Sequence, residues 1–278
     1  MNTQKNSIPR AVRFVKEFRT GSSLPFLIEA DDGMSYVVKL HGAGEGKLSM
    51  ITGMAASRIA GLLGIPVLPE LLIDFNPAII PTEADPEIID LAARSGGINT
   101  ATRFLPDAKP FTETMNVFSR EEKDMIFLTD LLLMNIDRTS KNPNILCGSS
   151  SAFCYDYALS MSVRSIFEPS AASPEKLLPL LKRHIFWHEQ IQPDQFLQRI
   201  TNINAGRIAS LAESLPNAWF PGFTLQELTE KLFSLISGST ALSDKLDALS
   251  RIPSESDEEI RRKNLNARQA FMDKFGKI

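Results

Sequence analysis

A polar turn followed by two short apolar runs is the feature that most constrains the fold of this chain. Residues 135–144 are rich in Asn, Asp, Ser and Pro, which favour turns over helices and strands. The apolar runs at 145–146 and 152–155 follow at a spacing that predicts the two strands of a hairpin. Such a hairpin would return Asp156, at its end, towards Asn142 in the turn.

The turn and the end of the hairpin carry three oxygen-bearing side chains whose spacing suits phosphate chemistry. A hydroxyl that attacks the terminal phosphate of ATP needs a carboxylate near its proton, and a divalent metal offsets the phosphate charge. We therefore assign Asp137 as a candidate catalytic residue. Asn142 and Asp156 are candidate ligands of Mg²⁺, which prefers hard oxygen donors. An Asp and an Asn at this spacing also occur by chance in turns, so the interpretation depends on the preceding half of the chain.

The preceding half has the pattern of a small antiparallel sheet. Apolar runs near 12–18, at 26–30 and at 36–40 predict three strands, with a turn signal between the last two. Lys39 lies among apolar neighbours in the third strand. A lysine there either binds nucleotide phosphates or reaches solvent from an edge strand. The order of turn, strand, strand-borne lysine, helix and polar loop favours nucleotide binding.

Gly21, Ser22 and Ser23 form a small-residue turn between the first two predicted strands. Their backbone amides and hydroxyls are candidate contacts to the nucleotide phosphates, although the same residues also suit a plain hairpin turn. A phosphate that the protein itself added to Ser22 or Ser23 would repel the nucleotide and disable the site. The alternative, in which these serines only shape the turn, stays open.

Taken in order, these segments resemble the HipA-like kinases. The resemblance covers roughly residues 12 to 190, and the loop D-R-T-x-x-N-P-N at 137–144 is its most specific part. The supporting segments are 18–23, 37–39, 56–58, 63–66 and 155–156. The resemblance implies a two-lobed, protein-kinase-like α+β fold, with a small mixed α/β N-terminal lobe and a mostly helical C-terminal lobe.

The resemblance also implies a chemistry. ATP would be the phosphate donor, Mg²⁺ the cofactor, and Ser or Thr hydroxyls the acceptors. By position, Asp137 matches the family's catalytic aspartate, and Asn142 and Asp156 match its two metal ligands. Lys39 matches its nucleotide-binding lysine.

Two positions depart from the pattern of the family. The family usually has a Glu in the helix after the lysine strand, where this chain has Gly53 and no acidic residue from 46 to 69. Another carboxylate, such as Glu45, would then have to orient Lys39. The family often has a glycine where this chain has Ala158, and glycine permits backbone conformations denied to alanine. These departures keep a non-catalytic nucleotide-binding regulator as an alternative.

We place the lobe boundary near residue 105, which divides the chain into an N-terminal lobe, 1–105, and a C-terminal lobe, 106–278. A nucleotide base would lie beside the linker at 106–110, which makes Arg103 and Phe104 candidate hinge residues, unless they are plain strand residues. The further expected elements are helices over 47–63, 86–93 and 125–134, strands over 71–75 and 98–105, and helices that begin at the capping boxes Ser119/Glu122, Thr224/Glu227 and Ser256/Glu259.

The composition limits the partners. The chain has 278 residues, of which 43% are hydrophobic and 23% charged, as in ordinary globular proteins. A net charge of −3 argues against nucleic acid or an acidic membrane surface as the primary partner. No apolar run approaches transmembrane length and residues 1–10 are polar, so we expect a cytoplasmic enzyme without a signal peptide.

ATP and an unidentified protein or small-molecule acceptor are the expected partners. The pattern D-R-x-x-x-N is also similar to the catalytic loop of phosphatidylinositol kinases, so a lipid or small-molecule kinase is a further alternative. The lack of a basic amphipathic helix argues against a membrane substrate. A regulatory partner chain of the toxin–antitoxin kind leaves no signal in the sequence.

The cysteines and histidines carry little signal. Cys147 and Cys154 flank the predicted hairpin, and we expect reduced thiols, because two cysteines make neither a disulfide framework nor a zinc site. His184 and His188 could share a helix face, but no third metal ligand accompanies them.

Overall fold

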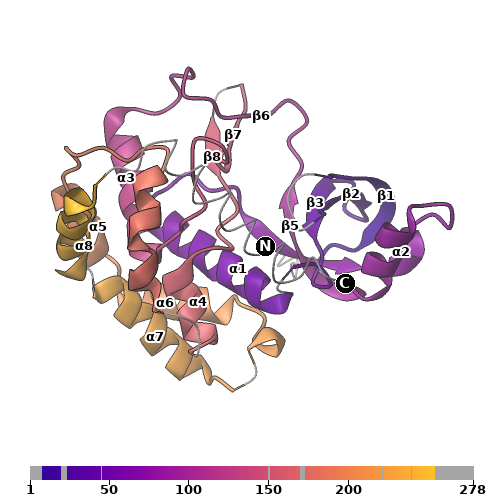
Figure 1. The fold of residues 1–278 in the computed structure, drawn as a ribbon. Coiled ribbons are helices and arrows are strands. Elements are labelled where there is room, and N and C mark those ends of the chain that lie inside the picture. The colour runs from indigo at the N-terminus through magenta and orange to yellow at the C-terminus, as the bar shows by residue number, and fades with distance from the viewer. Residues whose placement is uncertain are drawn as a thin grey trace, which may run out of the picture.

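A β-sheet and a larger group of helices form the two main parts of the molecule (Figure 1). The computed structural model describes residues 8–19, 24–44, 46–149, 151–169, 173–220, 222–238 and 240–253. In Figure 1 the sheet lies on the right and most helices on the left, and the segment after β5 runs across the top from one part to the other.

The N-terminal sheet has five strands in the order β1-β2-β3-β5-β4, and every neighbouring pair is antiparallel. The strands are β1 (Ala11–Glu17), β2 (Phe26–Ala30), β3 (Ser35–Lys39), β4 (Glu70–Phe75) and β5 (Gly97–Arg103). Because side chains alternate along a strand, the sheet has two distinct faces. One face, which includes Phe26, Val38 and Ile73, builds a small core together with α2 (Pro86–Ala93).

Helix α1 (Lys47–Leu62) covers the other face of the sheet. Apolar residues occur on nearly all its sides, and ten of its residues are buried. Gly64, at φ 85°, follows its end, and Pro66 prevents the helix from continuing. The buried side chains of α1 join the larger core of the molecule, which they share with the C-terminal helices.

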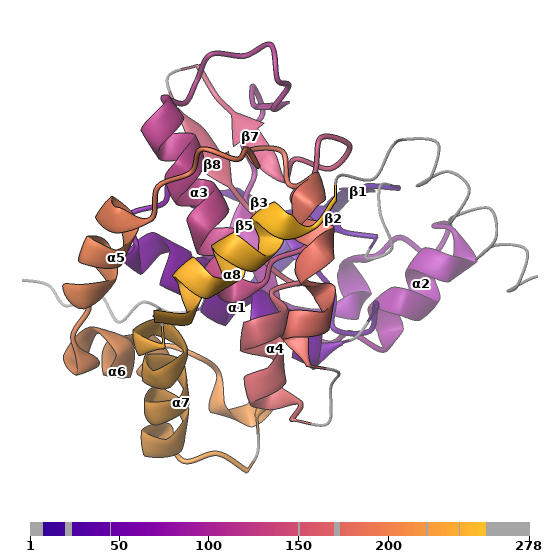
Figure 2. The ribbon, with the colours of Figure 1, turned by 60° about the vertical axis from the view of Figure 1, so that its left-hand side comes forward.

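The C-terminal part is mostly helical (Figure 2). Its α-helices are α3 (Arg120–Leu133), α4 (Met161–Phe167), α5 (Asp194–Thr201), α6 (Ala205–Glu213), α7 (Leu225–Ser237) and α8 (Thr240–Arg251). The 3₁₀ helices in the described residues are η1 (Pro77–Ile79) in the N-terminal part, η2 (Pro174–Arg183) and η3 (Asn217–Trp219). A small sheet has the order β6 (Lys109–Pro110), β7 (Ile145–Cys147) and β8 (Ala152–Cys154).

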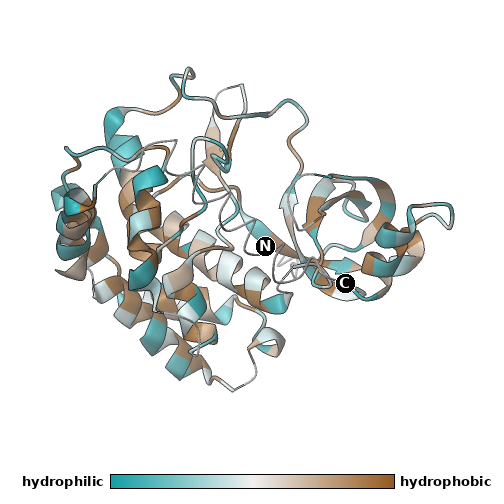
Figure 3. Ribbon diagram, in the orientation of Figure 1, coloured by the Kyte–Doolittle hydropathy of each residue, from teal (hydrophilic) through white to brown (hydrophobic). Residues whose placement is uncertain are grey.

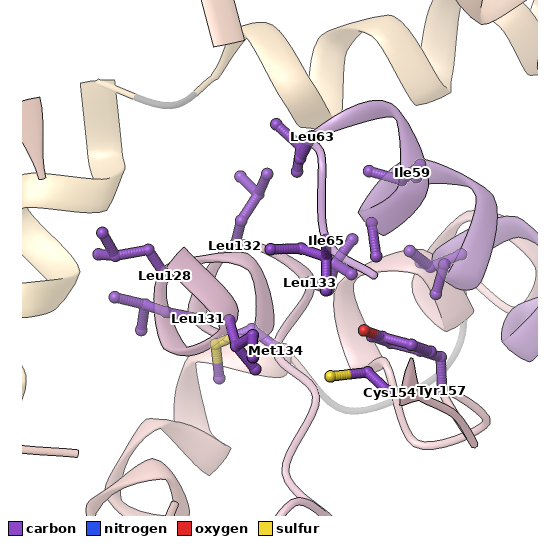
Figure 4. Close-up of a cluster of buried hydrophobic side chains, with 14 of the residues drawn as sticks. Ile59, Leu63, Ile65, Leu128, Leu131, Leu132, Leu133, Met134, Cys154 and Tyr157 are labelled. Carbon is purple, nitrogen blue, oxygen red and sulfur yellow. The ribbon is translucent and has the colours of Figure 1, made fainter. Parts of the chain in front are cut away.

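Helix α3 lies at the centre of the larger core. Ser119 and Glu122 form the expected capping box at its start, and its second half is buried throughout. Figure 4 shows leucines of this half beside Ile59 of α1 and Leu63, the residue that follows its end. The outer helices are amphipathic and carry hydrophilic residues among hydrophobic ones (Figure 3). The position of α3 matters for the candidate site, because the polar turn at 135–144 starts directly after its end.

The α+β fold expected from the sequence, with an N-terminal sheet and a helical second part, is confirmed. The predicted elements that lie in the described residues are present, with ends shifted by a few residues at most, except α3, which starts five residues earlier, at its capping box. The end of the expected linker differs, because residues 109–110 pair with β7 as a short strand. The boundary at residue 105 stays a prediction. Within the described residues, no helix combines the length and apolar character needed to cross a bilayer.

Candidate functional site

Strand β3 directs Lys39 towards α1. Val38 points into the small core of the sheet, so its neighbour Lys39 lies on the opposite face, paired across the sheet with Thr100. The ammonium nitrogen of Lys39 lies 2.6 Å from a carboxylate oxygen of Asp156. Burial opposes the positive charge of Lys39, but the carboxylates of Asp156 and Glu70 outweigh it and raise its pKa. The structure therefore brings together the predicted nucleotide lysine and a predicted metal ligand.

The β7–β8 hairpin returns Asp156 to this position, as the sequence predicts. Backbone hydrogen bonds tie Cys154 to Pro66 and Leu68, in the segment after α1, at 2.8 and 2.9 Å. Asp156 has a left-handed backbone with φ 54°, which Asp tolerates better than most residues. Burial alone would raise the pKa of Asp156, but Lys39 holds it below its usual range. The carboxylate is therefore kept in its charged form.

Ala158 adopts an ordinary backbone. It is not among the described residues with positive φ, and its backbone N–H points towards a carboxylate oxygen of Asp156 at 3.5 Å. Alanine in place of the family's glycine therefore costs no left-handed strain in this conformation.

Two asparagines of the polar turn hold the carboxylate of Asp137. One of its oxygens accepts hydrogen bonds from the side-chain amides of Asn142, at 2.8 Å, and Asn144, at 3.1 Å. The carbonyl of Asn144 in turn accepts a hydrogen bond from the backbone of Tyr155, at 2.9 Å. Since Tyr155 precedes Asp156, two short links join the candidate catalytic carboxylate to the candidate metal ligand.

The side-chain oxygen atoms at this site are of the kind that bind a magnesium ion together with a nucleotide. Asn142 uses its amide nitrogen towards Asp137, and its side-chain oxygen has no hydrogen bond within the described part of the chain. That oxygen and the carboxylate of Asp156 are the hard donors that Mg²⁺ takes alongside phosphate oxygens and water. Among the described residues, no group of three or more His, Cys, Asp or Glu could hold a metal by itself.

A buried network of charged residues connects the polar turn to α3. Arg138, the residue after Asp137, is fully buried, and its guanidinium donates to Asp130 of α3 at 2.6 Å. It also donates to the carbonyls of Pro143 and Asn144, at 3.2 and 2.6 Å. The turn therefore closes around one arginine, which is held by a carboxylate in the middle of the core.

Asp130 has further partners that keep it ionised. Its second oxygen accepts from the side-chain amide of Asn135 at 3.0 Å, and His184 Nε2 lies 2.9 Å from the oxygen that also binds Arg138. Burial would raise the pKa of Asp130, but Arg138 and His184 outweigh it and hold that pKa below its usual range. Burial also lowers the pKa of His184, against the opposing effect of Asp130. Tyr157 completes the network, with its ring 4.9 Å from the Arg138 guanidinium.

Asp130 and the role of His184 were not predicted from the sequence. Asp130 is the one charged residue between Met125 and Met134, and a charge inside an apolar helix signals a buried partner. His184 and His188 do not share an α-helical face, because η2 ends at Arg183. His188 instead lies 2.7 Å from Asp124.

Both cysteines of the hairpin are free and buried. Burial raises the pKa of both thiols, to about 11 for Cys154. Reduced thiols were expected here, and the structure has no disulfide between them.

The candidate hinge residues lie at the end of β5. Arg103 pairs with Tyr36 of β3, three residues from Lys39, and its guanidinium contacts the sulfur of Met34 at 3.2 Å. The backbone N–H of Phe104 donates to Ser35 at 2.9 Å. Contact of Arg103 and Phe104 with a nucleotide base stays a prediction.

Four residues of the predicted site are outside the described part of the chain. These are the turn residues Gly21, Ser22 and Ser23, and the candidate partner of Lys39, Glu45. A cavity of about 270 Å³ lies elsewhere, among α3, α4, α7 and α8, and none of the predicted site residues lines it.

A family model matches most of the chain. The profile of a family described as HipA-like kinase matches residues 11–235, which include β1, the lysine strand, the polar turn and the hairpin. The chain belongs to the HipA-like kinase family. No curated protein sequence matches it significantly.

Solved structures similar to this chain include two kinases. The Helicobacter pylori proinflammatory kinase CtkA has a TM-score of 0.49 at 12% identity, over 91% of this chain and 96% of CtkA. The Golgi casein kinase has a TM-score of 0.47 at 11% identity, over 88% of this chain and 73% of the other. A second structure of that kinase, with Mn/ADP bound, also has a TM-score of 0.47, at 12% identity.

Proposed function

We propose that this HipA-like kinase transfers the terminal phosphate of ATP, in a Mg²⁺-dependent reaction, to a Ser or Thr hydroxyl of a protein. The observation that carries the proposal is the link from Asp137 through Asn144 and Tyr155 to Asp156, which pairs with Lys39. These are the groups that phosphoryl transfer needs, in one place and on elements far apart in the sequence.

Each group has a distinct role in this proposal. Lys39 binds the phosphates of the nucleotide when it exchanges its contact with Asp156 for phosphate oxygens. Asp156 and Asn142 hold Mg²⁺, which offsets the charge that develops on the transferred phosphate. Asp137 accepts a hydrogen bond from the acceptor hydroxyl, orients it for attack, and receives its proton as the new O–P bond forms and the bond to ADP breaks.

A protein acceptor is supported over a membrane lipid. The net charge is −3, whereas recognition of anionic lipid surfaces relies on clustered Lys and Arg. Hydrogen-bonded positioning of Asp137 suits any hydroxyl, so the Ser/Thr specificity rests on the family resemblance.

The direct test is phosphate transfer by the purified protein. Labelled ATP with Mg²⁺ should yield labelled protein, either the protein itself or an added acceptor, and chelation of the metal should stop the labelling. The Asp137→Asn variant is the matched control, because it should bind ATP and transfer nothing. If the wild type binds ATP in a metal-dependent way but transfers no phosphate, the protein would instead be a non-catalytic regulator. The glycine at position 53, where the family usually has a Glu, is the reason for this alternative.

The same labelled protein tests the serines of the first turn. Mass spectrometry of the tryptic segment around Ser22 and Ser23 should find phosphate in the wild type and none in Asp137→Asn. An enzyme that labels an added acceptor but carries no phosphate on this segment would contradict self-inactivation and leave the kinase activity intact.

A further inference from the structure

Gly53 of α1 leaves room for a carboxylate that comes from another element. A β-carbon placed on Gly53 would lie 3.6 Å from a carboxylate oxygen of Glu70, and 3.5 Å from the backbone N and Cα of Ala158. Glu70 is the first residue of β4, and Ala158 follows Asp156 by two positions. The face of α1 that lacks a side chain is therefore directed at Glu70 and at the segment that carries the metal ligand.

The register of the sheet places Glu70 on the same face as Lys39. Glu70 pairs with Thr102 on β5, and Lys39 pairs with Thr100 on the same strand. Paired residues of antiparallel strands point to one side, and positions two apart along a strand also share a side. Both long side chains therefore extend from the sheet towards α1, across the one strand that separates them.

The charges around Glu70 favour interaction with Lys39. Burial raises the pKa of Glu70 and the negative charge of Asp156 adds to that rise, while the positive charges of Lys39 and Arg58 act against it. Among the described residues Glu70 has no hydrogen bond or direct ion pair, whereas Lys39 contacts Asp156 at 2.6 Å. Glu70 is thus a half-buried carboxylate that interacts electrostatically with the cations of Lys39 and Arg58.

We propose that Glu70 is the positioning residue for Lys39, and that it supplies from β4 the carboxylate that the helix lacks at Gly53. The proposal rests on the kinase function proposed above. Lys39 needs a second anion because Asp156 cannot both hold it and serve Mg²⁺. When Asp156 turns to the metal, Glu70 keeps the lysine aligned with the phosphates. Gly53 is required because a longer side chain there would occupy the place of the Glu70 carboxylate.

The variant Glu70→Gln tests the proposal, since it keeps the shape and removes the charge. Turnover should fall roughly tenfold or more, as expected when a reacting group is misplaced. Lys39 would then have Asp156 as its remaining carboxylate, so more Mg²⁺ should be needed to bind a non-hydrolysable ATP analogue, measured by calorimetry. Asp74→Asn is the matched control, because Asp74 is on the same strand and pairs with Arg10 instead. It should change neither quantity.

Relocating the carboxylate separates positioning from a merely structural role. Gly53→Glu alone should lower turnover, because it sets a second carboxylate against Glu70. The double variant Gly53→Glu/Glu70→Ala should recover turnover and Mg²⁺ dependence relative to Glu70→Ala. The same substitution at 53 is then harmful in one background and beneficial in the other, which loss of folding cannot produce. Thermal unfolding of each variant confirms that it is folded.

The outcomes are distinguishable. The proposal would be overturned if the wild type transfers phosphate and Glu70→Gln equals it in turnover and in Mg²⁺ dependence. The kinase function would then still stand. A folded double variant that regains nothing would also overturn it. A wild type that binds no Mg·ATP would contradict the proposed function, and the role of Glu70 with it.

Discussion

The two halves of the candidate site are held in opposite ways. On the polar turn, Arg138 and Asp130 form an ion pair whose side chains are both 0% exposed. On the sheet side, the pair of Lys39 and Asp156 is 28% and 30% exposed. A buried pair with several hydrogen bonds has one arrangement, because an unpaired charge in the core is very costly. A half-exposed pair can exchange partners at little cost.

The difference suits the two tasks. The carboxylate of Asp137 must keep its geometry, since a misplacement of about 1 Å can cost a large part of the rate. In the proposed reaction Lys39 and Asp156 must separate, so that Lys39 binds phosphate and Asp156 binds the metal. Under the proposed function, the rigid half thus fixes the acceptor side of the reaction, and the adjustable half accommodates the nucleotide.

Removal of the Asp137 carboxylate from the rigid half should have the largest effect on the rate of phosphate transfer. Asp137→Asn keeps an oxygen for the hydrogen bonds from Asn142 and Asn144, so the turn should hold its shape. The rate of phosphate transfer should fall by roughly 10²- to 10⁴-fold, the usual contribution of a positioned base. Single-turnover kinetics measure the rate, and calorimetry should find ATP affinity unchanged. The exposed Asp107→Asn is the control, and transfer by the Asp137 variant at the wild-type rate would place the base elsewhere.

Loss of the Arg138 side chain, which holds the polar turn to Asp130, should lower the free energy of unfolding. Arg138→Met leaves Asp130 buried without its main partner, which should cost about 3–5 kcal/mol of unfolding free energy. Chemical denaturation measures this loss. Arg13→Met is the matched control, because Arg13 pairs with Glu29 at the surface, and its midpoint should hardly move. Equal losses in the two variants would contradict the contrast between a rigid and an adjustable half.

On the adjustable half, Asp156→Ala should remove the dependence of nucleotide binding on Mg²⁺. Lys39 would still bind the phosphates, so metal-free ATP should bind about as well as it does to the wild type, while Mg²⁺ should add nothing. Titration calorimetry with and without Mg²⁺ measures both quantities, and Asp74→Asn is again the control. Equal Mg·ATP affinity of this variant and the wild type would remove Asp156 from the metal site.

The sequence indicated the candidate site residues better than the buried network that holds the polar turn. Lys39, Asn142 and Asp156 follow from local signals, namely a strand with a lysine, a turn, and a hairpin that returns the chain. The network of Asp130, Arg138 and His184 joins residues as far as 54 positions apart, and no local pattern encodes such a contact.

The partner of Lys39 shows the same limit. The sequence shows that Gly53 lacks a carboxylate, but the replacement at Glu70 depends on strand register across three strands. Strand register is set by side-chain packing across the whole sheet, so short segments of the sequence do not predict it.

The smallest effect should be on the pH dependence of stability, which tests the rigid half at His184. Burial lowers the pKa of His184 in the folded protein, with Asp130 and Arg138 as the charged groups that face it. The folded state therefore binds fewer protons than the unfolded state, in which the pKa is about 6.5. The stability that neutral His184 contributes is complete above that value and decreases as pH falls through it. His184→Gln can still donate to Asp130, and its stability should fall less than that of the wild type between about pH 7.5 and 5.5. Denaturation midpoints of the wild type and of His184→Gln across this range measure the two slopes. A variant at 184 as pH-sensitive as the wild type would mean that His184 is protonated in the folded network.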